Sequence, residues 1–383
     1  MRRATRLALS TIPSLLLIVV VEIFLTVVAP VSDPYEELKQ TGVGLNQYIK
    51  SEYQPNLRLS MTPEEGLPGV EGSSVFSTNN MGYRGHDITV PKPANEFRVF
   101  LVGGSTIETM VLDDSKSIDR VLEQHLNETS RSHRLVRVYN AGRSGDRSYD
   151  HISMLVHRIA HLQPDMVIVL VGVNDLIAAT NSTDYLHRTD KSLNKMSLSL
   201  LLRMVSTEFQ LPRRIRHAVT GVGETLGLRP AEVPAGGTYR EMVRFTQSLP
   251  ALAEPPRVDL VSYEENLKTI VGVGRGHGFQ VILMTQPSTW NSQVDMSASE
   301  WHWMNRGEKG RYREELMDDA LGEYNSVTVR VAHLNGTLLY DLASQMPKSS
   351  EFIYDDVHFN YAGAKRIGLG LANMISADWA MDE

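Results

Sequence analysis

Three residues far apart in the chain have the side chains that nucleophilic catalysis requires. Ser105 follows Gly103-Gly104 at the end of an apolar run, where its hydroxyl can project beyond a sheet edge. A serine hydroxyl is a weak nucleophile and needs a neighbouring base. His358 is the candidate base, and Asp355, three residues earlier, is close enough to orient the imidazole and stabilise its cation. These residue types predict acyl transfer through a covalent serine intermediate.

Acyl transfer also needs hydrogen-bond donors directed at the oxygen on which negative charge develops. Gly145 has no Cβ, so its backbone N–H can approach a substrate closely, and the side-chain amide of Asn174 offers a second donor. The backbone N–H of Ser105 is the third. Each residue alone is typical of ordinary turns and helix caps. Their order along the chain, each at the end of an apolar run, is the more specific signal.

The elements that must position these residues follow from the apolar pattern. Short apolar runs predict strands over 98–102, 135–139, 166–171, 281–285 and 338–342, and helical spacing predicts helices over 149–161, 263–276, 312–331 and 362–377. Alternating strands and helices predict a parallel sheet covered by helices on both faces. Ligands bind beyond the carboxyl ends of such strands. We therefore expect Ser105, Gly145 and Asn174 to meet at one edge of the sheet.

Four blocks of the sequence resemble the motifs of the SGNH hydrolases, also called GDSL-like esterases. The blocks are Gly103–Ser105, Asn140–Asp146, Gly172–Asp175 and Asp355–His358, and the resemblance covers about 96–383. It implies a flavodoxin-like three-layer α/β/α sandwich with a parallel sheet. It also implies a catalytic triad of Ser105, Asp355 and His358 and an oxyanion hole formed by Ser105, Gly145 and Asn174.

One block departs from the family pattern. The usual Gly-Asp-Ser reads Gly-Gly-Ser here, with Gly104 in place of the aspartate. That aspartate is not a member of the triad, so the departure weakens the inference about substrate and leaves the chemistry in place. The segment Asn80–Gly85 resembles that of membrane-anchored bacterial members associated with cell-surface polysaccharide.

The N-terminus predicts a membrane anchor. Arg2, Arg3 and Arg6 precede an apolar run over 7–29, which is long enough to span ~30 Å of hydrocarbon at ~1.5 Å per residue. The arginines favour a cytoplasmic N-terminus, which would place the catalytic domain outside the cytoplasm. A cleaved signal peptide and a buried helix are the alternative interpretations.

The pattern divides the chain into three parts. We expect a signal-anchor or transmembrane helix over 1–30, a stalk and irregular lead-in over 31–95, and the hydrolase domain over 96–383. A long insertion without strong strand signals occupies about 176–260. Its apolar and basic stretch predicts a packed cap, a lid or a membrane-facing surface.

Composition narrows the classes of partner and cofactor. The 383 residues include 45 acidic and 38 basic ones, a formal net charge of −7, which argues against nucleic-acid binding because that requires a basic surface. The absence of cysteine excludes disulfides, a cysteine nucleophile and thiolate metal sites. We expect no metal and no cofactor. The sequence leaves the oligomeric state open.

Two tryptophans mark a possible substrate loop. Trp301 and Trp303 follow the fourth predicted strand towards the catalytic edge of the sheet, and indole faces can stack on sugar rings. Packing in the core of a long loop is the alternative, because buried tryptophan is the commoner use.

Together these features predict a serine esterase that hydrolyses acyl esters, O-acetyl groups above all, on saccharides of the cell envelope. An acyltransferase that moves the acyl group to a sugar hydroxyl would use the same triad, and its acylated product would distinguish it. A catalytically silent scaffold with the same fold is the third hypothesis. The intact set of Ser105, Asp355 and His358 argues against that hypothesis.

Overall fold

The computed structural model describes two units of the chain separately. The described residues are 2–28, 43–44, 49, 52–129, 134–180, 209–212, 214–215 and 238–381. One unit comprises residues 1–40 and 186–236, and the other comprises residues 41–185 and 237–383. The second unit holds the sheet and the candidate site. Most of the predicted insertion at 176–260 lies outside the described residues, and its described C-terminal part includes α10 (Tyr239–Ser248).

The N-terminal segment forms a helix, α1 (Arg2–Val28). Across the residues that the structure describes, no helix combines the length and the sustained hydropathy that crossing a membrane requires. The single-pass membrane anchor predicted over 1–30 is therefore not supported.

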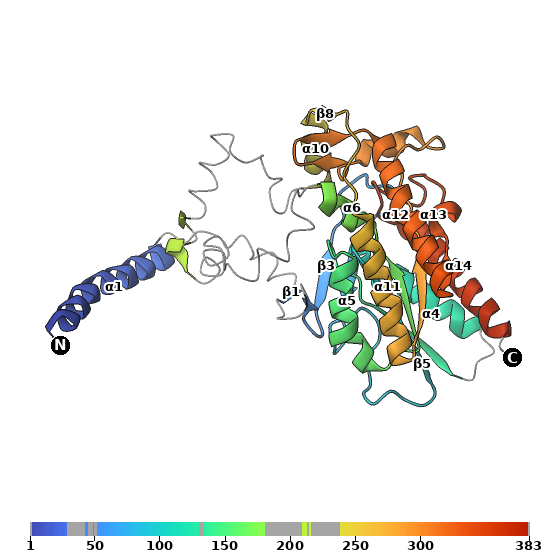
Figure 1. Ribbon diagram of the computed structural model, residues 1–383, viewed down its shortest axis with the longest axis horizontal. Helices are drawn as coiled ribbons and strands as arrows, with labels where there is room; N and C mark the ends of the chain where they lie inside the picture. Colours follow the sequence, from blue (N-terminus) through green and yellow to red (C-terminus); the bar gives the residue numbers. More distant parts are fainter. Residues whose placement is uncertain are drawn as a thin grey trace. The chain divides into compact units, whose positions relative to one another are not determined.

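A five-stranded parallel sheet forms the centre of the second unit (Figure 1). Its strands run in the order β12 (Leu338–Tyr340), β9 (Gln280–Met284), β7 (Met166–Leu170), β5 (Glu96–Gly103) and β6 (Leu135–Asn140). All four pairings between them are parallel. The predicted parallel α/β architecture is confirmed, and β5, which leads into Ser105, lies inside the sheet with a partner on each side.

Helices cover both faces of this sheet, as Figure 1 shows. One face carries α5 (Ser148–His157), α11 (Leu260–His277) and α12 (Glu314–Asn335), and the other carries α4 (Ile118–Thr129) and α14 (Tyr361–Met381). The shorter helices are α3 (Ser105–Glu108), α6 (Val173–Thr180) and α13 (Leu342–Gln345).

The alternation of side chains along β5 explains why both faces need a cover. Phe100 and Val102 pack into the core on the side of α11 and α12, whereas Val99 and Leu101 pack on the side of α4 and α14. All four side chains are fully buried. A strand buried on both faces reads as a continuous apolar run, which is why the sequence pattern located it.

The described residues also form three short sheets outside the central one. They pair β1 (Val43–Gly44) with β2 (Glu52–Tyr53), β3 (Arg58–Met61) with β4 (Ser74–Ser77), and β8 (Ala251–Leu252) and β10 (Arg306–Gly307) with β11 (Gly310–Tyr312). The last of these sheets joins the chain before α11 to the chain before α12. It contributes residues near the candidate site.

The described part of the lead-in packs on the domain that contains the central sheet. The backbone of Arg84 forms an antiparallel bridge with Asn140 at the end of β6. The buried guanidinium of Arg84 donates to the Asp114 carboxylate at 2.7 Å. It also donates to three buried carbonyls at the end of α3 and in the loop that follows it, those of Glu108, Thr109 and Leu112. Arg84 therefore fixes the loop that follows the candidate nucleophile.

We expect Arg84→Met to lower the free energy of unfolding by ~2–4 kcal/mol, because it leaves several buried carbonyls without a donor. Urea denaturation of the folded enzyme would measure the change. The matched control is Arg330→Met, which removes an exposed guanidinium that pairs with Glu264 and should cost at most ~1 kcal/mol. Equal losses for the two variants would contradict this role of Arg84.

Candidate active site

The candidate nucleophile lies at the junction between the central strand and the next helix. β5 ends at Gly103, Gly104 is the N-cap of α3, and Ser105 is the first residue of that helix. Its hydroxyl oxygen lies 2.8 Å from Nε2 of His358, although the two residues are 253 positions apart. The structure thus brings Ser105 and His358 within hydrogen-bond distance.

Asp355 holds the other side of the His358 ring. Its Oδ2 lies 2.7 Å from His358 Nδ1. Its Oδ1 also accepts the backbone N–H groups of Val357 at 3.0 Å and His358 at 2.9 Å. The carboxylate therefore closes a tight turn and orients the imidazole at once. A spacing of three residues suffices because acid and base belong to the same turn.

The two groups shift each other's pKa in opposite directions, so that Asp355 stays ionised and His358 binds a proton more readily. Burial alone would raise the pKa of Asp355, but the adjacent His358 and the turn N–H groups lower it below its usual range. Burial alone would lower the pKa of His358, but Asp355 raises it above the ordinary histidine range. The arrangement thus stabilises an imidazolium, the species that forms when a base takes a serine proton.

Trp303 contacts this pair directly. Its indole Nε1 donates to Asp355 Oδ2 at 3.2 Å, and its ring lies nearly parallel to the His358 ring, with the centroids 6.5 Å apart. Tyr354 lies nearly parallel to the same imidazole at 5.7 Å. The sequence pointed to Trp303 as a sugar platform, and that role stays a prediction. The contact with Asp355 depends on tertiary packing and was not expected.

Trp301 lies apart from these contacts. The Arg240 guanidinium lies over the Trp301 ring, 4.9 Å from its centroid. Trp301 packs against the core on the α4 and α14 side of the sheet. Its predicted part in a substrate loop is likewise untested.

Asp356 organises the loop beside the catalytic turn. The fully buried carboxylate accepts the indole N–H of Trp290 at 2.7 Å and the backbone N–H groups of Trp303 at 2.8 Å and Met304 at 3.1 Å. Burial raises the pKa of the Asp356 carboxyl above its usual range, and the charge of His302 opposes that shift in part. Sequence reasoning gave Asp356 no role, because its partners are up to 66 positions away.

Asn174 and Gly104 lie in close contact beside Ser105. Asn174 is the second residue of α6, directly after β7, and its Nδ2 donates to the carbonyl of Asp146 at 2.8 Å. An amide nitrogen carries two hydrogens, so one remains for a substrate oxygen. A Cβ on residue 104 would lie 2.3 Å from Asn174 Nδ2. The glycine that replaces the family's aspartate therefore makes room for the Asn174 amide.

The Glu108 carboxylate accepts hydrogen bonds from the turn that contains Gly145. Gly145 is exposed and has a φ of 72°, a conformation that favours glycine. The preceding Ser144 donates its hydroxyl to the buried carboxylate of Glu108, and Tyr53 donates to the other carboxylate oxygen at 2.7 Å. Because Glu108 belongs to α3, it ties the Gly145 turn to the helix that begins at Ser105.

Comparisons with known proteins identify the family of the chain. A family model for GDSL-like lipases and acylhydrolases matches residues 101–366. Comparison with curated protein sequences gives no significant match.

Solved structures with a similar backbone include three hydrolases of low sequence identity. A lipase/acylhydrolase from Enterococcus faecalis is 16% identical, with 74% of this chain and 97% of that chain covered and a TM-score of 0.41. An acetyl xylan esterase named AlAXEase is 13% identical, with coverages of 73% and 100% and a TM-score of 0.42. An acetylxylan esterase from Geobacillus stearothermophilus is 14% identical, with coverages of 74% and 94% and a TM-score of 0.39.

These structural likenesses are too distant to carry an argument about substrate. The family model is a stronger finding, since its match over residues 101–366 takes in more than half of the 383 residues. The chain therefore belongs to the GDSL-like lipase/acylhydrolase family and is an ester-hydrolysing enzyme.

Proposed function

We propose that this enzyme is a serine esterase with Ser105, His358 and Asp355 as its triad, and that its substrates are acyl esters, chiefly O-acetyl groups, on cell-envelope saccharides. One observation carries the proposal of the triad: the continuous chain of contacts from Ser105 Oγ to His358 Nε2 at 2.8 Å and from His358 Nδ1 to Asp355 Oδ2 at 2.7 Å. The saccharide substrate rests on the sequence resemblance.

The geometry suits a two-step reaction. Ser105 Oγ attacks the ester carbonyl carbon while His358 Nε2 takes the hydroxyl proton. The carbonyl oxygen becomes an oxyanion, which the N–H groups of Ser105 and Gly145 and the Asn174 amide stabilise. The C–O bond to the alcohol then breaks, and His358 returns the proton to the leaving alcohol oxygen.

Water completes the cycle. It attacks the acyl-serine carbonyl, and His358 takes a water proton and returns it to Ser105 as the acid leaves. A sugar hydroxyl in place of water would give acyl transfer by the same residues.

Identifying the products tests the proposal. The enzyme is incubated with p-nitrophenyl acetate and with acetylated polysaccharides, and free acetate and acylated saccharides are quantified. Release of acetate from a polysaccharide supports the esterase. Acylated acceptor in place of free acetate would identify an acyltransferase, and no turnover of any ester would identify a silent scaffold.

Ser105→Ala and His358→Ala should each lower turnover of p-nitrophenyl acetate by ~10⁴-fold or more, and the double variant should be little worse, because the residues act as a unit. Asp355→Asn should cost less, since the residue orients the base and stabilises its cation. Steady-state kinetics and thermal unfolding would be recorded for each variant.

The control for the acid is the exposed Asp319, whose replacement by asparagine should change neither the rate nor the melting temperature. Asp356 is unsuitable because its loss would release the loop at Trp303 and Met304. A folded Asp355→Asn variant with the rate of the parent enzyme would remove Asp355 from the triad.

The contact between Gly104 and Asn174 gives a second test. Asn174→Ala should lower turnover by ~100-fold or more, the usual effect of losing one oxyanion donor. Gly104→Ala should displace the same amide, because the new Cβ would lie 2.3 Å from its nitrogen. We expect a loss of about tenfold or more, in kcat rather than in KM.

Gly322→Ala is the matched control, because that helical glycine has open space around its Cα. Its kinetics should not change. If Gly104→Ala kept full activity in a folded protein, the placement of Asn174 in the oxyanion hole would be wrong.

The rate should fall as pH drops through the pKa of His358, because a protonated imidazole cannot accept the Ser105 proton. Asp355 raises that pKa, so the acid limb of kcat/KM should lie above the ordinary histidine value of ~6.5. Asp355→Asn removes the negative charge and should move the limb to lower pH. A limb that stays in place in this variant would show that another group controls it.

A further inference from the structure

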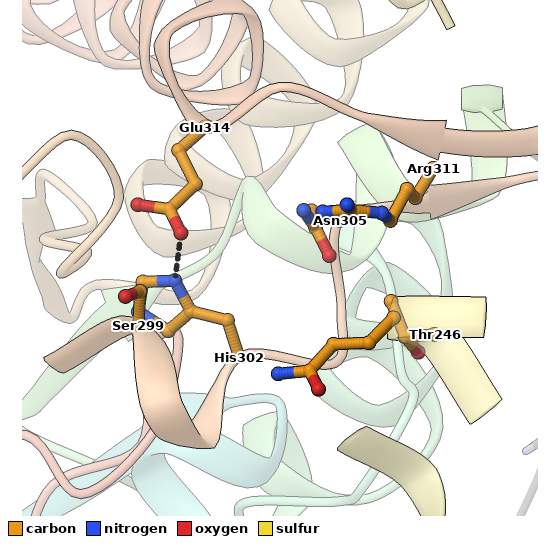
Figure 2. Close-up of a pocket in the computed structure, with 7 residues that line it drawn as sticks. Thr246, Ser299, His302, Asn305, Arg311 and Glu314 are labelled. Carbon is orange, nitrogen blue, oxygen red and sulfur yellow. Dashed lines mark hydrogen bonds and ion pairs between the residues drawn. The ribbon is translucent and has the colours of Figure 1, made fainter. Parts of the chain in front are cut away.

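A separate polar cavity lies close to the catalytic turn. It has a volume of about 340 Å³ and is lined by Thr246, Gln247, Ser299, His302, Asn305, Arg311 and Glu314. Figure 2 shows these side chains around a common space, with contributions from α10, the loop before β10, β11 and the start of α12. Most of the lining groups are amides, hydroxyls and charged groups, which suits a small polar ligand.

One wall of the cavity is an ion pair. His302 Nδ1 lies 2.8 Å from Glu314 Oε1, shown as the dashed line in Figure 2. The other ring nitrogen of His302 lies 2.8 Å from the Thr289 hydroxyl, which reaches the backbone carbonyl of Asp355. Glu314 also accepts the backbone N–H of Asn291 at 3.3 Å. The Glu314 carboxylate is thus already hydrogen-bonded to protein donors.

The opposite wall holds two buried polar atoms without protein partners. Among the described residues, neither Arg311 Nε nor Asn305 Oδ1 has a hydrogen-bond partner. The Asn305 amide nitrogen donates to the carbonyl of Tyr312 at 2.8 Å, which fixes the orientation of the carboxamide. Asn305 is only 4% exposed. A buried donor and a buried acceptor left unpaired are costly, so a ligand that satisfies both would bind favourably.

The chemistry of the two atoms specifies the ligand. Burial alone would raise the pKa of Glu314, but His302 above all, with a smaller contribution from the Arg311 guanidinium, lowers it below its usual range. No ion pair involving Arg311 occurs in the described part of the chain. A guanidinium binds a carboxylate in a planar, two-point geometry. Asn305 Oδ1 accepts from a hydroxyl. The nearby negative charge of Glu314 disfavours a doubly charged phosphate relative to a singly charged carboxylate.

We propose that this cavity is a subsite for a carboxylated sugar unit, with its carboxylate on Arg311 and a ring hydroxyl on Asn305. The loop that forms it also carries Trp303, whose carbonyl accepts from Thr246 at 3.0 Å and whose ring lies against His358. The subsite therefore adjoins the triad. The proposal rests on the proposed function and narrows its substrate to acylated saccharides that contain uronic acid units.

The direct test measures binding without turnover. Galacturonate and galactose are titrated into the Ser105→Ala enzyme by calorimetry or by ligand-observed NMR. Galacturonate should bind at least about tenfold more tightly than galactose, and Arg311→Gln in the same background should remove that difference. Arg313→Gln is the matched control. Arg313 lies two residues from Arg311 and its side chain is exposed, so the variant removes the same charge outside the cavity. It should preserve the preference. Equal binding of the two sugars, or a preference that survives Arg311→Gln, would overturn the subsite.

A kinetic test connects the subsite to the substrate. Acetate release is compared on acetylated polygalacturonate and on acetylated xylan, a neutral polysaccharide. Arg311→Gln should raise KM for the acidic polymer about tenfold more than for the neutral one, and Arg313→Gln should leave the ratio unchanged. An equal effect on both polymers would overturn the assignment. If the parent enzyme cleaves p-nitrophenyl acetate but neither polymer, the proposed saccharide substrate fails, and the calorimetric comparison still decides whether the cavity binds a sugar acid.

Discussion

The buried carboxylate of Asp355 is the constraint on which the rest of the site depends. A charge that is removed from water must be matched by donors, and four donors converge on it: two backbone N–H groups, the His358 ring and the Trp303 indole. Satisfying this charge closes the turn at 355–358 and brings the loop at Trp303 against it. The neighbouring Asp356 anchors the same loop from the other side. The same hydrogen bonds that satisfy the Asp355 carboxylate therefore also orient the His358 ring.

The proposed nucleophile is positioned by different interactions. The position of Ser105 is set by a strand buried on both faces, and both close packing and buried charged groups shape its surroundings. Gly104 gives room to the Asn174 amide, and Glu108 joins α3 to the turn of Gly145. Arg84, from the lead-in, then ties down the loop that leaves α3. One group of contacts centres on α3 and the other on the turn at 355–358, and they meet where Ser105 Oγ lies 2.8 Å from His358 Nε2.

The sequence predicted those parts that depend on local pattern. All five strands appear where apolar runs occur, with β12 ending at Tyr340 rather than continuing to residue 342. The predicted helix over 149–161 is an α-helix to His157 followed by a 3-10 turn over Ile159–Leu162. Ser105, Asp355 and His358 could be selected because each adjoins a recognisable strand end or turn.

Other parts depend on contacts between distant residues and left no local signal. Trp303 was noted for its ring, but its hydrogen bond to Asp355 crosses 52 positions. Arg84 and Glu108 look like ordinary surface charges in the sequence, yet both are buried. The unpaired atoms of Arg311 and Asn305 become visible only when neighbouring side chains are in place. The described lead-in, set apart from the domain by its irregular pattern, belongs to the same unit as the sheet.

Because acid and base share one turn, the chain has few long-range distances to preserve over evolution. The turn at 355–358 must meet the end of β5, and the loops that join the intervening strands and helices can differ in length without altering that turn. In this chain 253 positions separate Ser105 and His358, and they include the long segment between α6 and α10. A longer loop between these elements would therefore leave the geometry of Asp355 and His358 unchanged.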